Sequence, residues 1–201
     1  MINRNDAEQL ILTRRSTRKF RDLPVPEDML TEIIEAGRHA PSGGNSQTTH
    51  LLVIRDKKVL ADIAALAEKL FAAMEVTPGM YRSMAGSVRS AKKGGYIFHY
   101  NAPVLILTAN DKDYSNNIAD CSCVLENMMI MANACDLGSC WINQIKWLRD
   151  EPEMIAFLEG LGLKENERVY GGLALGFADT EDGLPVRTPL SRTGNPVTYI
   201  G

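Results

Sequence analysis

The chain has 201 residues, of which 45% are hydrophobic and 23% charged, and this composition fits one ordinary globular domain. Its formal net charge of −3 argues against a nucleic-acid-binding protein, because such proteins need a basic surface stripe. No apolar run reaches the length of about eighteen residues that suggests a membrane-spanning helix. Residues 1–5 lack the hydrophobic core of a signal peptide, so we expect a cytoplasmic protein.

Apolar periodicity, together with glycine and proline positions, predicts the secondary structure along the chain. The expected helices cover residues 6–13, 26–40, 58–74, 117–137 and 154–161. The expected strands cover residues 51–54, 104–108, 139–143 and 169–175. No repeat or linker divides these elements, so we expect a single α+β domain over residues 1–201.

Two segments allow more than one interpretation. Residues 76–100 contain four glycines, several aromatic residues, and Lys92 and Lys93, which is typical both of a lid over a site and of a plain surface connection. The helix expected at 117–137 is apolar almost all round. It fits the centre of a monomer and a subunit interface equally well.

The strand at 169–175 contains two glycines, which permit close approach of another backbone or a ligand.

The cysteines and histidines show no metal-binding pattern. The four cysteines, Cys121, Cys123, Cys135 and Cys140, lie close together in the sequence but include no C-x-x-C pair. The three histidines lack a ligand spacing such as H-E-x-x-H. We therefore expect no metal site.

Two segments carry the chemistry of a ligand site. Residues 14–18, R-R-S-T-R, combine three guanidinium groups with two hydroxyls, which suits a phosphate, although arginines also gather at the C-terminal ends of helices. Residues 40–47, A-P-S-G-G-N-S-Q, form a glycine-containing loop whose backbone can approach a flat ligand, or a generic turn that ends a helix.

In this order and spacing, the two segments resemble the flavin-dependent nitroreductase family. The similarity continues through N-A-P-V at 101–104, L-G-S-C-W-I at 137–142 and P-V-R-T-P-L at 185–190, and spans nearly the whole chain. The resemblance implies an α+β fold with a mixed sheet surrounded by helices. It also implies an intertwined homodimer with two FMN molecules at the subunit interface, in which helix 117–137 is a dimer helix.

The resemblance further assigns roles to individual residues. The implied FMN-binding residues are Arg14, Arg15, Ser16, Arg18, Pro41, Ser42, Gly43, Asn45, Trp141, Ile142, Asn143, Gln144 and Arg187. Residues 14–16 and Arg187 would hold the phosphate and the ribityl chain, and Arg18 would stabilise the anionic reduced flavin. The loop 41–45 would come from the partner subunit. A backbone N–H within 141–144 would bond flavin N5, although Asn143 and Gln144 stand where many relatives carry a glycine or an acidic residue.

The implied chemistry belongs to the cofactor. FMN would accept a hydride from NADH or NADPH and pass electrons to a nitroaromatic, quinone or similar small-molecule acceptor in a ping-pong cycle. No side-chain nucleophile or acid–base pair is required, so the expected contribution of Arg18 is tuning of the flavin. Two alternatives remain open: a specialised dehydrogenase or reductive dehalogenase of the same fold, and a noncatalytic FMN-binding protein.

Overall fold

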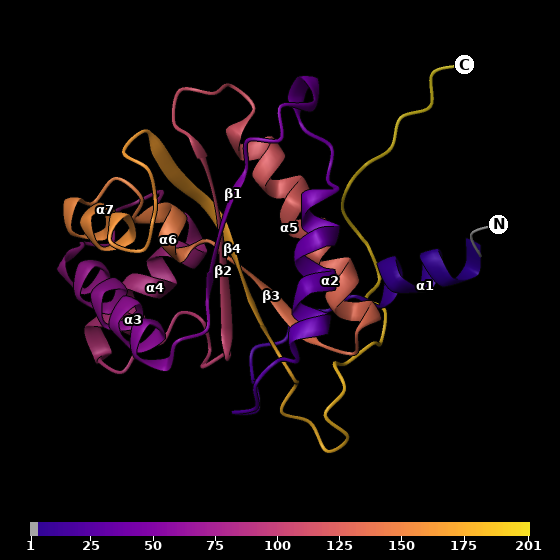
Figure 1. The fold of residues 1–201 in the computed structure, drawn as a ribbon, viewed down its shortest axis with the longest axis horizontal. Helices are drawn as coiled ribbons and strands as arrows, with labels where there is room; N and C mark the ends of the chain where they lie inside the picture. The colour runs from indigo at the N-terminus through magenta and orange to yellow at the C-terminus, as the bar shows by residue number, and fades with distance from the viewer. Residues whose placement is uncertain (1–3) are drawn as a thin grey trace.

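A four-stranded sheet separates two layers of helices (Figure 1). The structure is a computed structural model and describes residues 4–201. The strands lie in the order β1 (His50–Ile54), β2 (Val104–Asp111), β4 (Glu167–Gly176) and β3 (Gly138–Ile142). Each pair of neighbours is antiparallel. The expected α+β class is confirmed.

The parallel component expected of a mixed sheet is small within this chain. Among residues 4–201, the parallel pairing is confined to one isolated bridge, between Ser16 and Ser139. The reason is local: the segment that carries Ser16 runs beside β3, but it pairs there at a single position and does not form a strand. The named strands therefore form an antiparallel sheet.

The helices cover both faces of the sheet. One layer contains α3 (Lys57–Ala73), α4 (Arg82–Lys93), α6 (Gln144–Trp147) and α7 (Pro152–Glu159), and the other contains α2 (Glu27–Arg38) and α5 (Asn117–Ala134). Alternate residues of β2 face opposite layers, since Leu105 and Leu107 join the first core and Val104 and Ile106 the second. This explains why residues 104–107 of β2 form a continuous apolar run.

Local sequence signals explain where several helices begin. The Asp56 side chain caps α3 by accepting a hydrogen bond from the Val59 N–H at 2.9 Å. Pro152 occupies the first turn of α7, where its missing N–H leaves no hydrogen bond unmade. Acidic Glu27 and Asp28 lie in the first turn of α2, at the positive end of the helix dipole.

Every helix and strand predicted from periodicity is present, within a few residues of its expected bounds. Two α-helices were not predicted, and neither was the short 3-10 helix η1 (Gly43–Asn45). The segment 76–100 contains α4, whose buried residues Ala85, Ser87, Val88 and Ala91 include three small side chains, which give a weak hydrophobic signal. The four-residue helix α6 is too short to show a helical period.

Two details of packing differ from the sequence-based expectation. The strand glycines admit side chains of the core, because a Cβ on Gly171 would lie 2.6 Å from Leu125 Cδ1 and one on Gly172 would lie 2.9 Å from Leu107 Cδ2. Helix α5 is not buried on every side. It packs on α2 and on the sheet, while Ile118 remains 45% exposed on its outer face.

Both ends of the chain extend from the body of the molecule (Figure 1). Helix α1 (Arg4–Thr13) buries none of its residues, although it carries apolar Ile11 and Leu12. Residues 188–201 are exposed throughout, including Tyr199 and Ile200 at 92% and 96%. Within residues 4–201, no helix has the length and apolar character needed to cross a bilayer.

Candidate functional site

The arginine-rich segment after α1 lies in extended conformation beside β3. The Thr17 N–H donates to the Ser139 carbonyl at 2.8 Å, and Ser16 bridges Ser139. Because side chains alternate along an extended chain, Arg14, Ser16 and Arg18 share one side. The structure therefore brings together three of the residues expected to bind FMN.

Cys140 of β3 lies at the centre of this group. Burial raises the pKa of its thiol, and the Arg18 charge, a hydrogen bond with Ser16 and the Arg14 charge all act in the opposite direction. Three side chains therefore converge on one buried residue of the sheet. The convergence creates a concentrated positive potential at this edge of β3.

The two guanidinium groups of this side have few competing partners. Arg14 Nε lies 3.7 Å from Glu126 Oε1 on α5, which is a long ion pair. Arg18 hydrogen-bonds Tyr100, a residue that sequence analysis left without a role. Burial raises the pKa of the Tyr100 phenol, and the bond with Arg18 opposes that rise.

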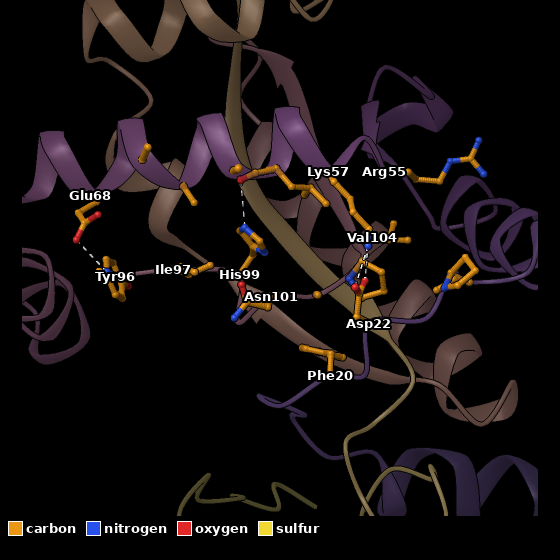
Figure 2. A pocket seen from close by; sticks show the side chains of 18 of the residues that line it. Phe20, Asp22, Arg55, Lys57, Glu68, Tyr96, Ile97, His99, Asn101 and Val104 are labelled. Atoms are coloured by element: carbon orange, nitrogen blue, oxygen red, sulfur yellow. Dashed lines mark hydrogen bonds and ion pairs between the residues drawn. The ribbon is translucent and has the colours of Figure 1, made fainter. Parts of the chain in front are cut away.

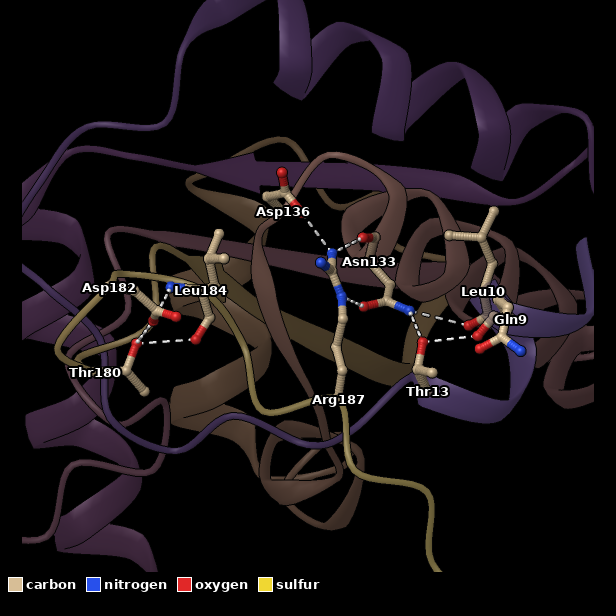
Figure 3. Close-up of polar contacts among 9 residues, drawn as sticks. All are labelled: Gln9, Leu10, Thr13, Asn133, Asp136, Thr180, Asp182, Leu184 and Arg187. Atoms are coloured by element: carbon tan, nitrogen blue, oxygen red, sulfur yellow. Dashed lines mark hydrogen bonds and ion pairs between the residues drawn. The ribbon is translucent and has the colours of Figure 1, made fainter. Parts of the chain in front are cut away.

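Arg15 and Arg187 contact different groups. Arg15 Nη1 donates to the Thr188 carbonyl at 2.5 Å and so binds the C-terminal segment. The Arg187 guanidinium donates to the Asn133 side-chain oxygen at 3.1 Å, to the Asn133 carbonyl at 2.5 Å and to Asp136 at 2.6 Å (Figure 3). Unlike Arg14, both arginines therefore donate short hydrogen bonds to oxygen atoms of the protein itself.

The loop that follows α2 is held at the other end of α5. The Gly43 N–H donates to the buried Asp120 carboxylate at 3.1 Å, and the Tyr114 hydroxyl donates to the Gly43 carbonyl at 3.2 Å. A Cβ on Gly43 would lie 2.2 Å from the Asn116 amide nitrogen, so a side chain at this position would require Asn116 to move. The Ser42 hydroxyl accepts the Gln47 N–H at 3.0 Å. Of the remaining predicted loop residues, Pro41 and Asn45 are exposed.

This loop and the arginine segment do not meet within one chain (Figure 1). The loop contacts α5 at Asp120, whereas Arg14 reaches α5 at Glu126 and Arg187 reaches it at Asn133. At 1.5 Å per residue these positions lie about 9 Å and about 20 Å from Asp120 along the helix. The segments expected to share one FMN therefore lie apart in the monomer.

The segment 141–144 connects the end of β3 to α6 and carries a chain of hydrogen bonds. Trp141 Nε1 donates to Asn143 Oδ1 at 3.0 Å, and the Asn143 N–H donates to Gln144 Oε1 at 3.1 Å. Gln144 Nε2 in turn donates to the Tyr96 hydroxyl at 3.0 Å. The Tyr96 hydroxyl also bonds Ser87 on α4, at 2.8 Å. Ile142 is buried beneath this network.

Tyr96 and Tyr100 lie in the ambiguous segment 76–100, and neither is among the FMN-binding residues that the resemblance implies. Each contacts an expected FMN-binding residue, Gln144 in one case and Arg18 in the other. The available signal was the aromatic content of segment 76–100, which does not distinguish a site from a core.

Two adjoining cavities open beside these tyrosines. One, of about 640 Å³, is lined by Arg18, Tyr100 and Lys93 among others. The other, of about 1010 Å³, runs along α3 and is shown in Figure 2. Phe20, Tyr96, Ile97 and Asn101 line both. Figure 2 also shows the bond between buried His99 and the Leu60 carbonyl, at 3.2 Å. No cluster of three or more potential metal ligands occurs within residues 4–201.

Comparison with known proteins identifies the family. A sequence profile described as the nitroreductase family matches residues 11–177, most of the chain. The chain belongs to the nitroreductase family. Two relatives of this nitroreductase family member are an Archaeoglobus fulgidus protein, provisionally named as an NADH dehydrogenase/NAD(P)H nitroreductase, and the nitrobenzene nitroreductase of Ectopseudomonas oleovorans. They are 28% and 25% identical, and each alignment covers 86% of both chains.

Solved structures give the same result for this nitroreductase family member. The nitroreductase of Bacteroides fragilis, crystallised with bound FMN, superposes with a TM-score of 0.86 at 30% identity, and all of both chains is covered. The expected family and its fold are therefore confirmed.

The donor chemistry of this chain fits FMN. A phosphate needs cationic and hydroxyl donors, which Arg14 and Ser16 supply on the side of the segment that faces Cys140. Arg18 lies on the same side of the segment, two residues beyond Ser16, and supplies a further positive charge. The start of β3 lies next to this row of donors, since Ser139 pairs with Ser16.

Proposed function

We propose that this protein is an FMN-dependent oxidoreductase that transfers electrons from NADH or NADPH to nitroaromatic, quinone or similar small-molecule acceptors in a ping-pong cycle. The observation that carries the proposal is the row formed by Arg14, Ser16 and Arg18 beside Cys140, at the edge of β3. The FMN bound by the Bacteroides fragilis relative and the nitrobenzene reductase activity named for the Ectopseudomonas protein support it.

The residues of the chain would bind and orient the cofactor. Arg14 and Ser16 would hold its phosphate, with Arg15 and Arg187 beside them, and Arg18 would place a positive charge at the pyrimidine edge. Bound FMN supplies the redox chemistry, accepting a hydride and passing electrons onward. The network from Asn143 through Gln144 to Tyr96 would fix the backbone at the end of β3. That fixed backbone would present its N–H groups to the ring in one orientation.

We also propose that the protein is an intertwined homodimer in which the loop 41–45 comes from the partner. The resemblance implies that this loop and Arg14 bind the same FMN. Because the two segments lie apart within one chain, their separation supports a site shared between two subunits. Exposed apolar side chains add support: Ile11 on α1, Ile118 on α5, and Tyr199 and Ile200 in the tail. A second copy would cover such surfaces, as obligate dimers do.

The remaining expectations concern organisation and location. We propose that residues 1–201 form one domain, since a single sheet supports both cores. Residues 1–3 lie outside the described part. A cytoplasmic location remains a prediction from the sequence.

An anaerobic titration tests the function. The FMN-loaded protein is titrated with NADH and, separately, with NADPH, while the visible absorbance of the oxidised flavin is followed. Bleaching by one equivalent of reductant, followed by recovery of the colour on adding a nitroaromatic or a quinone, is the expected result. Bound flavin that neither nicotinamide bleaches would contradict the proposal and favour a noncatalytic FMN-binding protein.

The same titration addresses a specialised enzyme of this fold. Bleaching without recovery by nitroaromatics or quinones would favour a dedicated dehydrogenase or a reductive dehalogenase. A dehalogenase of tyrosine derivatives would need charged and aromatic residues of segment 76–100 to enclose a zwitterionic substrate. In this chain Lys92 is instead paired with Glu75 at 2.7 Å, and Tyr96 is bonded to Ser87 and Gln144.

A further inference from the structure

The cavity of about 640 Å³ beside Arg18 has a distinct charge pattern. Three cationic residues line it, Arg18, Lys19 and Lys93, against one acidic residue, Asp179. Phe20 and Ile97 add apolar wall. We propose that Lys19 and Lys93, beside the cofactor-binding Arg18, form an anion subsite that binds the carboxylate of an aromatic electron acceptor. This inference rests on the proposed function and specifies its substrate class.

The two lysines are available for a ligand. In the described part of the chain, no carboxylate lies within ion-pair distance of Lys93 or Lys19. The neighbouring Lys92 behaves differently, since its ammonium lies 2.7 Å from Glu75 Oε1. Adjacent lysines on one helix thus have different surroundings, one paired and one facing the cavity. An exposed ammonium without a partner retains its full capacity to attract an anion.

The backbone around the cavity is held in unusual conformations. Gly94 and Gly95 follow Lys93 with φ of 85° and 74°, which makes the chain reverse directly after α4. Tyr100 and Asn101 are also left-handed, with φ of 57° and 56°, although neither is glycine. All four residues line the cavity. Left-handed residues other than glycine cost free energy and cluster at ligand sites, where surrounding structure holds them in place.

The position of Lys19 is fixed as well. The Asp179 N–H donates to the Lys19 carbonyl at 3.0 Å, which ties the segment after Arg18 to the end of β4. Arg18 itself is held by Tyr100. Arg18 and Lys19 therefore belong to a backbone segment that is hydrogen-bonded to β3 before Arg18 and to the residues after β4 at Lys19. The third cationic residue, Lys93, approaches from α4 across the cavity.

The shape of the site indicates an aromatic acid. The cationic cavity adjoins the larger one along α3, and Phe20, Tyr96 and Ile97 line both. A ligand that spans this boundary would place a charged group among the lysines and a flat apolar body against these side chains. A phosphate of the nicotinamide dinucleotide carries the same kind of charge, and the experiment must separate these two sources.

The test compares a charged acceptor with its uncharged analogue. The kcat/KM values for 4-nitrobenzoate and for methyl 4-nitrobenzoate are measured with wild type, Lys93→Ala, Lys19→Ala and Lys93→Arg, at saturating NADH. We expect the ratio of the two kcat/KM values to fall about three- to tenfold in Lys93→Ala and Lys19→Ala, as for partly exposed charge-assisted contacts. Lys93→Arg should retain the ratio. Lys92→Ala is the matched control, and its ratio should equal that of the wild type.

Two further readouts do not depend on turnover. Benzoate and benzamide serve as unreactive probes, and their dissociation constants for the FMN-loaded protein are measured by calorimetry. Benzoate should bind more weakly to Lys93→Ala than to wild type, whereas the affinity for benzamide should not change. Raising the salt concentration should weaken benzoate binding to the wild type, because exposed charges are screened.

Several results would overturn the subsite. An unchanged kcat/KM ratio in Lys93→Ala together with unchanged benzoate affinity would do so. So would loss of FMN from that variant, which would make Lys93 a cofactor contact, or slower bleaching by NADH at a constant ratio, which would assign the cations to the dinucleotide. Failure of the proposed function gives a different result: neither nicotinamide bleaches the flavin in any variant, while the benzoate measurements still test the subsite.

Discussion

Asn133, near the end of α5, binds Arg187 of the C-terminal segment through both its side-chain oxygen and its carbonyl (Figure 3). Its side-chain amide donates at 3.0 Å to the Leu10 carbonyl and at 3.0 Å to the Thr13 hydroxyl. One buried asparagine therefore joins α5, the end of α1 and the tail. Both extensions of the chain are therefore in direct contact with this residue.

Asn133→Ala should release both extensions. The variant loses the two amide bonds and one bond from Arg187, so we expect a loss of about 2 kcal/mol in unfolding free energy. Limited proteolysis should cut within residues 188–201 and near α1 faster than in wild type. The exposed tail substitution Thr193→Ala is the control. Equal cleavage rates in Asn133→Ala and wild type would show that these contacts do not direct the extensions.

Arg14→Ala should weaken FMN binding. The guanidinium faces the same side as Ser16 and has one long ion pair, so its donors are free for a phosphate. The expected loss is about 1.5 to 3 kcal/mol, the range for hydrogen bonds to charged groups. Fluorescence titration of the apoprotein with FMN measures it. Arg38→Ala, at the exposed end of α2, should leave the affinity unchanged, and an unchanged affinity in Arg14→Ala would remove this residue from the site.

Tyr96→Phe should loosen the connection between α4 and the end of β3. The variant removes the hydroxyl that Gln144 donates to and that bonds Ser87, so we expect about 1 kcal/mol lower stability per lost bond. Because Gln144 also engages the Asn143 N–H, the flavin midpoint potential should shift as well. Spectroelectrochemistry measures that shift, with Tyr199→Phe in the exposed tail as control. A potential equal to that of wild type would limit Tyr96 to a structural role.

His99 should make stability depend on pH near neutrality. The residue is 4% exposed, and burial lowers its pKa below the ordinary value of 6.5. The unfolded chain then binds the proton more readily, so its contribution to stability is complete above about pH 6.5 and decreases as the pH falls below it. Denaturant midpoints of wild type should decrease from pH 7 to pH 5.5. His99→Gln should be less stable at pH 7 and show a flatter profile, whereas exposed His39→Gln should retain the wild-type slope.

Ile118→Arg should weaken the dimer. Ile118 lies on the outer face of α5 and is 45% exposed in the single chain, so an arginine there can extend into solvent when the chain is monomeric. Burial of an unpaired charge at a subunit interface is unfavourable. Sedimentation should show a higher dissociation constant than for wild type, with the exposed α3 substitution Lys58→Ala as control. A wild-type protein that sediments as a stable, FMN-loaded monomer at micromolar concentration would contradict the dimer proposal.

The sequence predicted most of the fold because its elements have strong local signals. The apolar run of β2 and the proline-led start of α2 each specify their element without tertiary information. Helix α4 was missed, since its buried side carries mostly alanine and serine, with Val88 as its one larger apolar residue, and the helix as a whole is polar. The exposed face of α5 was also missed, because an apolar side chain such as Ile118 does not reveal what covers it.

The candidate site was predictable to a lesser extent. Arg14, Ser16 and Arg18 were found because they lie within one five-residue segment of the sequence. As alternate residues of an extended chain, they share one side. The roles of Arg15 and Arg187 as anchors of the tail depend on contacts across more than fifty residues, which no local pattern encodes. The same holds for Tyr100, whose contact with Arg18 is formed by the fold.

The separation of Arg14 from the Gly43 loop along α5 has a genetic consequence. In a dimer, each cofactor would lie between the arginines of one subunit and the loop of the other. A subunit altered at Arg14 and a subunit altered at Gly43 would each form inactive homodimers. Mixed together, they would assemble heterodimers in which both defects fall on one site and the second site is intact. Two inactive alleles would therefore complement each other when they are expressed in the same cell.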